Sequence, residues 1–180
     1  DMSHVTDMSY MFSGVVLVDP TDGLNWNTSS VTNLSHMFYG CVKVPNTNYL
    51  TRWDVSNVTD FSYMFYNDAA LKDISTLRTW ILGTNANINM AHMFDGCGVT
   101  DLGPLAFDGT NGYWNTNKVT NMEGMFQNAT GITSQEPLKF WDVSNVYTME
   151  NMFRNCTALT TVNLSRWAMR TVGAFTHNGT

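Results

Sequence analysis

The sequence predicts an α/β solenoid, a stack of similar coils with short parallel strands on one side and short helices on the other. Three observations carry this prediction: a phrase that occurs twice, a Met-Phe pair that recurs, and apolar residues at fixed distances from that pair. The phrase reads WDVSNVTDFSYMF at 53–65 and WDVSNVYTMENMF at 141–153, 88 residues later. Self-similarity at a regular period indicates a repeat architecture.

The Met-Phe pair marks six copies of one unit. Its phenylalanines are 26 to 32 residues apart: Phe12, Phe38, Phe65, Phe94, Phe126 and Phe153. An apolar residue precedes each Phe by four positions, Val precedes five of them by seven, and Trp precedes four of them by twelve. In the fourth copy Ile88 takes the valine position, and Trp80 is displaced by two residues. A unit of this length cannot bury its apolar face alone, so residues 1–180 are expected to form one array of six to seven stacked coils.

Each copy is expected to contain one short helix and one short strand. In 58–67, the apolar residues Val58, Phe61, Met64 and Phe65 are spaced as one helical face. Asp or Asn five residues before Phe suits a helix N-cap, and Gly or Asn two residues after it suits a left-handed C-cap. The alternation of β-branched and apolar residues in 159–167 predicts a strand that pairs in parallel with its neighbours.

The unit WDVSNVTDFSYMFYN, with FRNCTALTTVNL at 153–164, resembles the 26-residue repeat of bacterial surface proteins. That repeat is related to the BspA-like leucine-rich repeats and is common in mycoplasma and Listeria surface lipoproteins. The resemblance covers nearly all 180 residues. It implies a leucine-rich-repeat-like solenoid that is secreted or exposed on a cell surface, with adhesion as its expected role. The chain departs from the pattern in its unequal repeat lengths and in the weak strand residues of 42–50.

Composition excludes some classes of function. The formal net charge is −6 and 13% of residues are charged, which argues against a nucleic-acid partner because such proteins present a basic face. No apolar run is long enough to cross a membrane. The chain opens and closes within a repeat and lacks the polar capping units that arrays normally have, so it is expected to be a fragment of a longer protein.

The three cysteines are expected to be buried free thiols. Cys41, Cys97 and Cys156 belong to alternate copies. With coils stacked about 4.8 Å apart, alternate coils are about 10 Å apart, beyond the roughly 7 Å that a disulfide spans between Cα atoms. No catalytic residue, metal site or cofactor is expected, since the four histidines show no metal-ligand spacing and no phosphate-binding glycine loop is present.

Two repeat positions, two residues before Phe and one after it, vary too much to belong to a core. In the first four copies they hold the residues that we call the aromatic ridge: Tyr10, His36, Tyr39, Tyr63, Tyr66 and His92. The two positions are three residues apart and are expected to share the outer face of the short helix. Two interpretations stay open: a contact surface for a protein or a glycan, or a half-buried surface that packs on itself.

Asp and Asn recur in two columns. One column follows each Trp and the other precedes each expected helix: Asn27, Asp54, Asn115 and Asp142, and Asp7, Asn33, Asp60, Asn89 and Asn121. Stacked carboxylates would suit calcium, but the alternation of Asp with Asn favours turns and helix caps.

Seven N-x-Ser/Thr sequons are candidate glycosylation sites if the protein is secreted from a eukaryotic cell. They lie at Asn27, Asn33, Asn57, Asn128, Asn155, Asn163 and Asn178.

The sequence therefore predicts a non-catalytic extracellular or cell-surface repeat module that contacts a protein or a glycan. The alternative is a structural protomer segment of an extracellular filament, sheath or appendage, because the open ends of a solenoid invite assembly with copies of itself.

Overall fold

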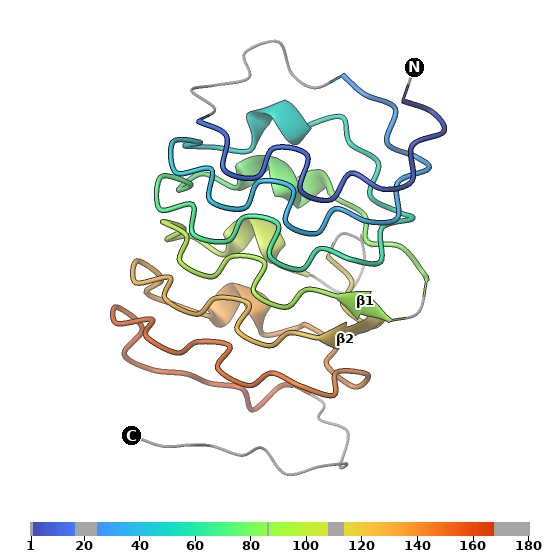
Figure 1. Cartoon of the computed structure of the whole chain (residues 1–180). Helices are drawn as coiled ribbons and strands as arrows, with labels where there is room; N and C mark the ends of the chain where they lie inside the picture. Colours follow the sequence, from blue (N-terminus) through green and yellow to red (C-terminus); the bar gives the residue numbers. More distant parts are fainter. Residues whose placement is uncertain (1, 17–24, 86, 108–113, 168–180) are drawn as a thin grey trace.

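A computed structural model describes residues 2–16, 25–85, 87–107 and 114–167. The copies of the repeat lie one above another as coils, with the N-terminal copy at the top of Figure 1. The regular elements of the described residues are short: the strands β1 (Ile88–Asn89) and β2 (Val119–Asn121), and the 3-10 helices η1 (Asn48–Leu50), η2 (Ser75–Thr79), η3 (Gly103–Leu105) and η4 (Glu136–Leu138). The leucine-rich-repeat-like class stays a prediction.

The Met-Phe segments are runs of turns, so the helix predicted over 58–67 is wrong. Tyr63 has a φ of 57° and Asn67 a φ of 59°, left-handed conformations that a right-handed helix excludes. Their N–H groups donate to the carbonyls of Ala91 and Asp95 in the next coil. The prediction failed because overlapping turns place apolar residues at nearly the same spacing as a helical face.

A hydrogen-bond ladder joins neighbouring coils through these turns. In each of the first five copies, four N–H groups donate to carbonyls of the next copy. They belong to the residues four and two positions before Phe, to Phe itself, and to the residue two positions after it. The N–H groups between them close turns within their own copy, as when Met64 donates to Phe61 at 3.2 Å and Tyr66 to Tyr63 at 3.1 Å. The backbone of each run is therefore satisfied without a helix or a regular strand.

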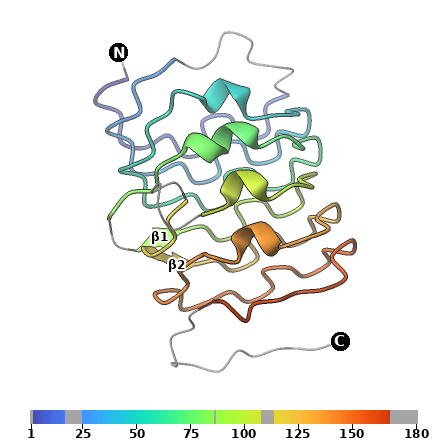
Figure 2. The ribbon, with the colours of Figure 1, turned by 180° about the vertical axis from the view of Figure 1, so that it is seen from behind.

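The 3-10 helices lie one above another on the far side of the coils, where strands were expected (Figure 2). No strand forms over 159–167, so the strand predicted there is wrong. Residues 42–50, whose strand residues are weak, contain one isolated parallel bridge, from Asn46 to Asp73. Proline occupies the first turn of η3 and η4, where its fixed φ suits a tight turn. Most of the parallel pairing is in the Val-Thr-Asx segment, where Ile88 of β1 lies opposite Val119 of β2. Ile88 thus takes the valine position, as predicted.

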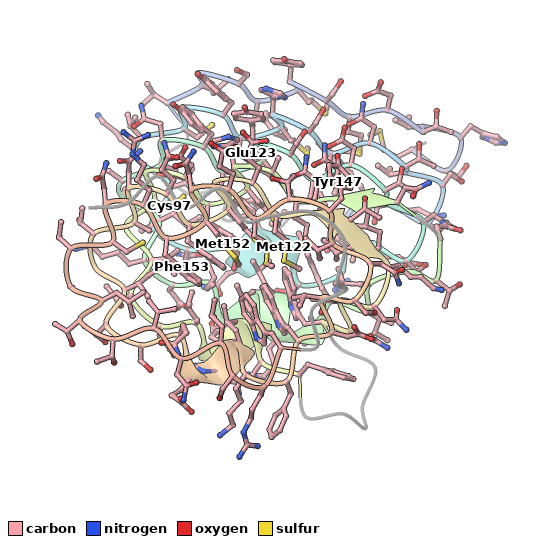
Figure 3. All side chains as sticks on the ribbon, turned by 90° about the horizontal axis from the view of Figure 1, so that it is seen from below. Cys97, Met122, Glu123, Tyr147, Met152 and Phe153 are labelled. Atoms are coloured by element: carbon pink, nitrogen blue, oxygen red, sulfur yellow. The ribbon has the colours of Figure 1, made fainter. Side chains whose placement is uncertain are left out.

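The predicted core columns are confirmed. Centroids of successive Met-Phe phenylalanine rings are 5.5 to 5.7 Å apart from Phe12 to Phe153, and each pair is stacked. Trp80, despite its displacement in sequence, stacks on Trp114 at 6.5 Å. Seen along the stack, Met122 and Met152 lie inside the coil, and Glu123 and Tyr147 lie outside it (Figure 3).

The three cysteines are buried free thiols, as predicted. Each thiol donates to the carbonyl oxygen of the Met-Phe phenylalanine in the preceding copy, as Cys97 does to Phe65 at 2.8 Å. Burial raises the pKa of Cys41 and Cys156 to about 11, so both thiols are protonated at neutral pH.

Asp68 occupies the cysteine position of the third copy and is fully buried. Within the described residues, neither of its carboxylate oxygens accepts a hydrogen bond of ordinary geometry. Burial raises the pKa of this carboxyl from 3.8 to about 7, against the weaker opposing effect of the Leu71 and Ala70 N–H groups. Because the native state binds this proton more tightly than the unfolded chain, stability falls as pH rises from about 4 to about 7.

Phe65→Ala is expected to lower the free energy of unfolding by about 3–5 kcal/mol, because it empties the middle of the phenylalanine column. Urea denaturation followed by tryptophan fluorescence measures the loss. Tyr147→Ala is the matched control, since this ring is 73% exposed and should change stability little. Equal stability of the two variants would contradict the column assignment.

Asp68→Asn is expected to raise the free energy of unfolding at pH 8 by up to about 4 kcal/mol, the equivalent of three pKa units. At pH 4, where the buried carboxyl is protonated, the gain should largely disappear. Denaturation curves at both pH values test this. Asp73→Asn is the control, and it should lower the free energy of unfolding at pH 8. Hydrogen bonds from Ser75 lower the pKa of Asp73, so the charged form of Asp73 favours the native state. A gain for Asp68→Asn that is the same at both pH values would contradict this assignment.

Candidate functional site

The structure brings all six residues of the aromatic ridge together. Tyr10, His36, Tyr63 and His92 form a continuous stack with centroid separations of 4.3, 4.7 and 4.7 Å and interplanar angles of 13° to 16°. Four residues that are 26 to 29 positions apart in sequence thus form a single column on the surface of the coils.

The second column of the ridge lies beside the first. Tyr39 stacks on Tyr66 at 4.8 Å. Within one coil, His36 lies 5.6 Å from Tyr39, and Tyr63 lies 5.5 Å from Tyr66. The predicted adjacency of the two positions is therefore present, although turns rather than a helix produce it.

The backbone at the first column is left-handed in every copy. Tyr10, His36, Tyr63 and His92 have φ between 55° and 58°, and Gly124 and Asn151 have φ of 57° and 59° at the same repeat position. Gly and Asn adopt this conformation readily, whereas Tyr and His do so at a cost of about 1–2 kcal/mol each. Ring stacking, about 0.5–1.5 kcal/mol per pair, offsets much of this cost.

The first column ends where His92 covers Gly124. A Cβ added to Gly124 would lie 2.3 Å from Cε1 of His92, so the imidazole occupies the space that a fifth side chain would need. Nδ1 of His92 lies 2.8 Å from Oδ2 of Asp95. Asn128 donates to Oδ1 of the same carboxylate at 2.8 Å, and Asn155 donates to Asn128 at 2.8 Å. The ridge therefore continues into the last two coils as a polar chain.

Asp95 and Gly124 occupy the two ridge positions of their copies, but sequence reasoning did not predict their contacts and did not connect Asn128 with this surface. Gly124 occupies a ridge position, and this exchange of a large ring for glycine was the one available signal of a close approach.

Partial burial shapes the electrostatics of the ridge. Burial lowers the pKa of His36, against the opposing effect of Asp60, so this imidazole favours its neutral form. Burial raises the pKa of Tyr63 and Tyr66, and nearby carboxylates add to the rise. The phenol groups of Tyr63 and Tyr66 therefore stay protonated at neutral pH.

Most ring faces of the ridge are covered by the rings above and below. Tyr10 is 57% exposed and Tyr39 is 36% exposed, whereas His36, Tyr63, Tyr66 and His92 are less exposed. The inner rings therefore present edges and polar tips to a partner, and a flat ring face is open mainly on Tyr10.

The Asp and Asn columns form turns, as favoured from the sequence. Oδ1 of Asp60 accepts the N–H of Ser62 at 2.8 Å, and Oδ1 of Asp54 accepts that of Ser56 at 2.9 Å. The same bond, to the N–H two residues on, recurs at Asp7, Asn27, Asn33, Asn89, Asn115, Asn121 and Asp142. Among the described residues, no group of three or more His, Cys, Asp or Glu side chains could hold a metal ion.

Four sequon asparagines use the nitrogen that would carry a glycan to bind a neighbouring coil. Nδ2 donates from Asn33 to Asp7, from Asn57 to Ser29, from Asn128 to Asp95, and from Asn155 to Asn128. Within the described residues, the side chains of Asn27 and Asn163 form hydrogen bonds through Oδ1, in turns. Asn178 lies outside the described residues. Asn27 and Asn163 are therefore the sequons whose modification would disturb no described contact between coils.

In the described part of the chain, no helix has the length and apolar character that a membrane span requires.

Comparison with known protein families identifies the family of this chain. A family model described as "Mycoplasma protein of unknown function, DUF285" matches residues 1–103 and again residues 84–178. The two overlapping matches support the repeat organisation. No curated protein and no solved structure matches the chain. With nearly its whole length matched, the chain belongs to the DUF285 family of Mycoplasma proteins of unknown function.

Proposed function

We propose that this chain is a non-catalytic module of an extracellular or cell-surface protein, built as a leucine-rich-repeat-like solenoid, that contacts a partner through the aromatic ridge. The observation that carries the proposal is the continuous stack of Tyr and His rings on left-handed backbone. Gly and Asn would satisfy the same turn with less strain, so turn geometry alone does not account for the rings.

Stacking pre-organises the ridge for binding. Each inner ring is held between two others, so it has little rotamer freedom left to lose when a partner arrives. Tyrosine supplies a large contact area together with a polar tip and is enriched at protein interfaces for that reason.

The exposed parts of the ridge favour a protein partner over a glycan. Sugars pack on open aromatic faces, and here the inner rings cover one another. Ring edges and phenol groups suit an extended protein surface that lies across several coils. A glycan remains the alternative at Tyr10, whose exposed fraction is 57%.

A triple variant built from the array's own residues tests the ridge. Tyr39→Ser, Tyr63→Asn and Tyr66→Gln introduce the residues that Ser13, Asn151 and Gln127 supply at the same repeat positions. The fold should persist, because each new side chain already suits its turn elsewhere in the array. Binding to partners found on protein and glycan arrays should weaken more than tenfold, as loss of aromatic contact residues does.

The matched control is Tyr147→Thr. Tyr147 is 73% exposed and occupies a repeat position that is Thr in four other copies, away from the ridge. It should bind like the parent chain. Undiminished binding of a folded triple variant would show that the ridge is not the contact surface.

A second function, assembly with copies of itself, has one specific observation in its favour. Exposed apolar side chains gather on the first coil: Tyr10, Met11, Val15 and Val16. A second copy that stacks end to end would cover them. Met11→Asn with Val16→Thr should then abolish concentration-dependent assembly in sedimentation velocity, while a monomeric parent chain at high concentration would exclude this function for the isolated chain.

A further inference from the structure

The helix η4, orange in Figure 2, lies on the side of the coils away from the Met-Phe turns. Residues of η4 and of the segment after it, Glu136 and Lys139, form part of the lining of a polar notch. Its volume is about 140 Å³, and it is lined by Glu136, Lys139, Asn163 and Arg166. The residues come from the fifth and sixth copies, so the coil stack brings them together.

Two cations that line the notch, Lys139 and Arg166, also contact an exposed aromatic ring. Phe140 is 46% exposed, although its neighbour Trp141 is buried. Nζ of Lys139 lies 5.4 Å from the ring centroid, and the guanidinium carbon of Arg166 lies 5.5 Å from it. Both distances are within the range of cation–π attraction, so one ring contacts both cations.

The positive charge of the notch is only partly compensated. Lys139 forms an ion pair with Glu136 at 3.7 Å. Arg166 takes part in none of the ion pairs found among the described residues. The side chain of Asn163 accepts the N–H of Ser165 through Oδ1, which leaves its NH₂ group as a further donor. In a chain with a net charge of −6, this notch is a local cluster of donors.

The size of the notch limits its ligand. Its volume of about 140 Å³ is enough for several waters. Pockets that enclose a whole small molecule are larger, about 300–1,000 Å³. The notch therefore suits one charged substituent of a larger molecule, whose remainder lies on the surface outside.

We propose that this notch binds a carboxylate or sulfate group of an acidic polysaccharide. The guanidinium of Arg166 offers paired N–H donors to such a group, and Lys139 adds a second positive charge. The part of Phe140 that the two cations leave exposed adds apolar surface next to the charged group, on which the C–H groups of the adjoining sugar can pack. Glu136 opposes an anion and keeps the affinity of the isolated notch low. This site does not depend on the ridge.

The test measures binding of the whole chain to immobilised polygalacturonate and dextran sulfate, with neutral dextran and polyglutamate as comparison polymers. The parent chain should bind the two acidic polysaccharides, and binding should weaken as salt rises. Arg166→Ala should weaken it about tenfold, since charge-assisted hydrogen bonds are lost. Glu136→Gln should strengthen it a few-fold, because a repelling charge is removed from a surface site.

Arg78→Ala is the matched control, because Arg78 is an exposed cation in the last turn of η2 on the same side of the coils. It should leave binding unchanged, and thermal melting should show that every variant is folded. Arg166→Lys keeps the positive charge but removes the paired N–H donors. This variant should bind the acidic polysaccharides less tightly than the parent chain does. No binding to either acidic polysaccharide would overturn the proposal, as would equal binding by folded Arg166→Ala or equally tight binding of polyglutamate.

Discussion

The structure depends on the hydrogen-bond ladder that joins each Met-Phe turn run to the next coil. Every second N–H of the run donates to a carbonyl of the next coil, and the intervening N–H groups close turns within their own coil. This alternation needs left-handed residues two before and two after Phe, and the described copies have them at both places. Because the rungs recur at equivalent positions, each residue lies directly above its counterpart in the next coil.

That alignment explains both the core and the surface. Inside the coils it stacks the phenylalanine rings 5.5 to 5.7 Å apart, and outside it stacks Tyr10, His36, Tyr63 and His92 still more closely. Because of the same alignment, a side chain that does not suit its column destabilises the fold. Asp68 enters a column that otherwise holds small or thiol side chains, and its carboxylate accepts no hydrogen bond of ordinary geometry among the described residues. Ring stacking stabilises the ridge on strained backbone, whereas nothing comparable stabilises Asp68.

The sequence predicted the location of residues that recur at the same repeat position. It did not predict contacts that occur at only one place in the stack. The core columns, the role of Ile88 and the membership of the ridge follow from repeat positions. The local backbone conformation could not be predicted in this way, because Asx turns and helix caps use the same residues. Runs of turns also place apolar residues at nearly the same spacing as a helix does. Gly124 and Asn151 marked the left-handed position inside the expected helix. The contact of His92 with Gly124, the bond between Asp95 and Asn128, and the notch at Arg166 join side chains of neighbouring coils that are far apart in sequence, with no shared motif to signal them.

The most direct test of this account is scalar coupling across hydrogen bonds, measured by NMR on isotope-labelled protein. The ladder predicts couplings from the amide nitrogen of Tyr63 to the carbonyl carbon of Ala91, and from that of Phe65 to that of Met93, at N···O distances of 2.9 and 3.0 Å. A helix over 58–67 would instead couple Tyr63 to the carbonyl of Thr59, four residues earlier. Couplings to Ala91 and Met93 would establish the ladder, and a coupling to Thr59 would contradict it.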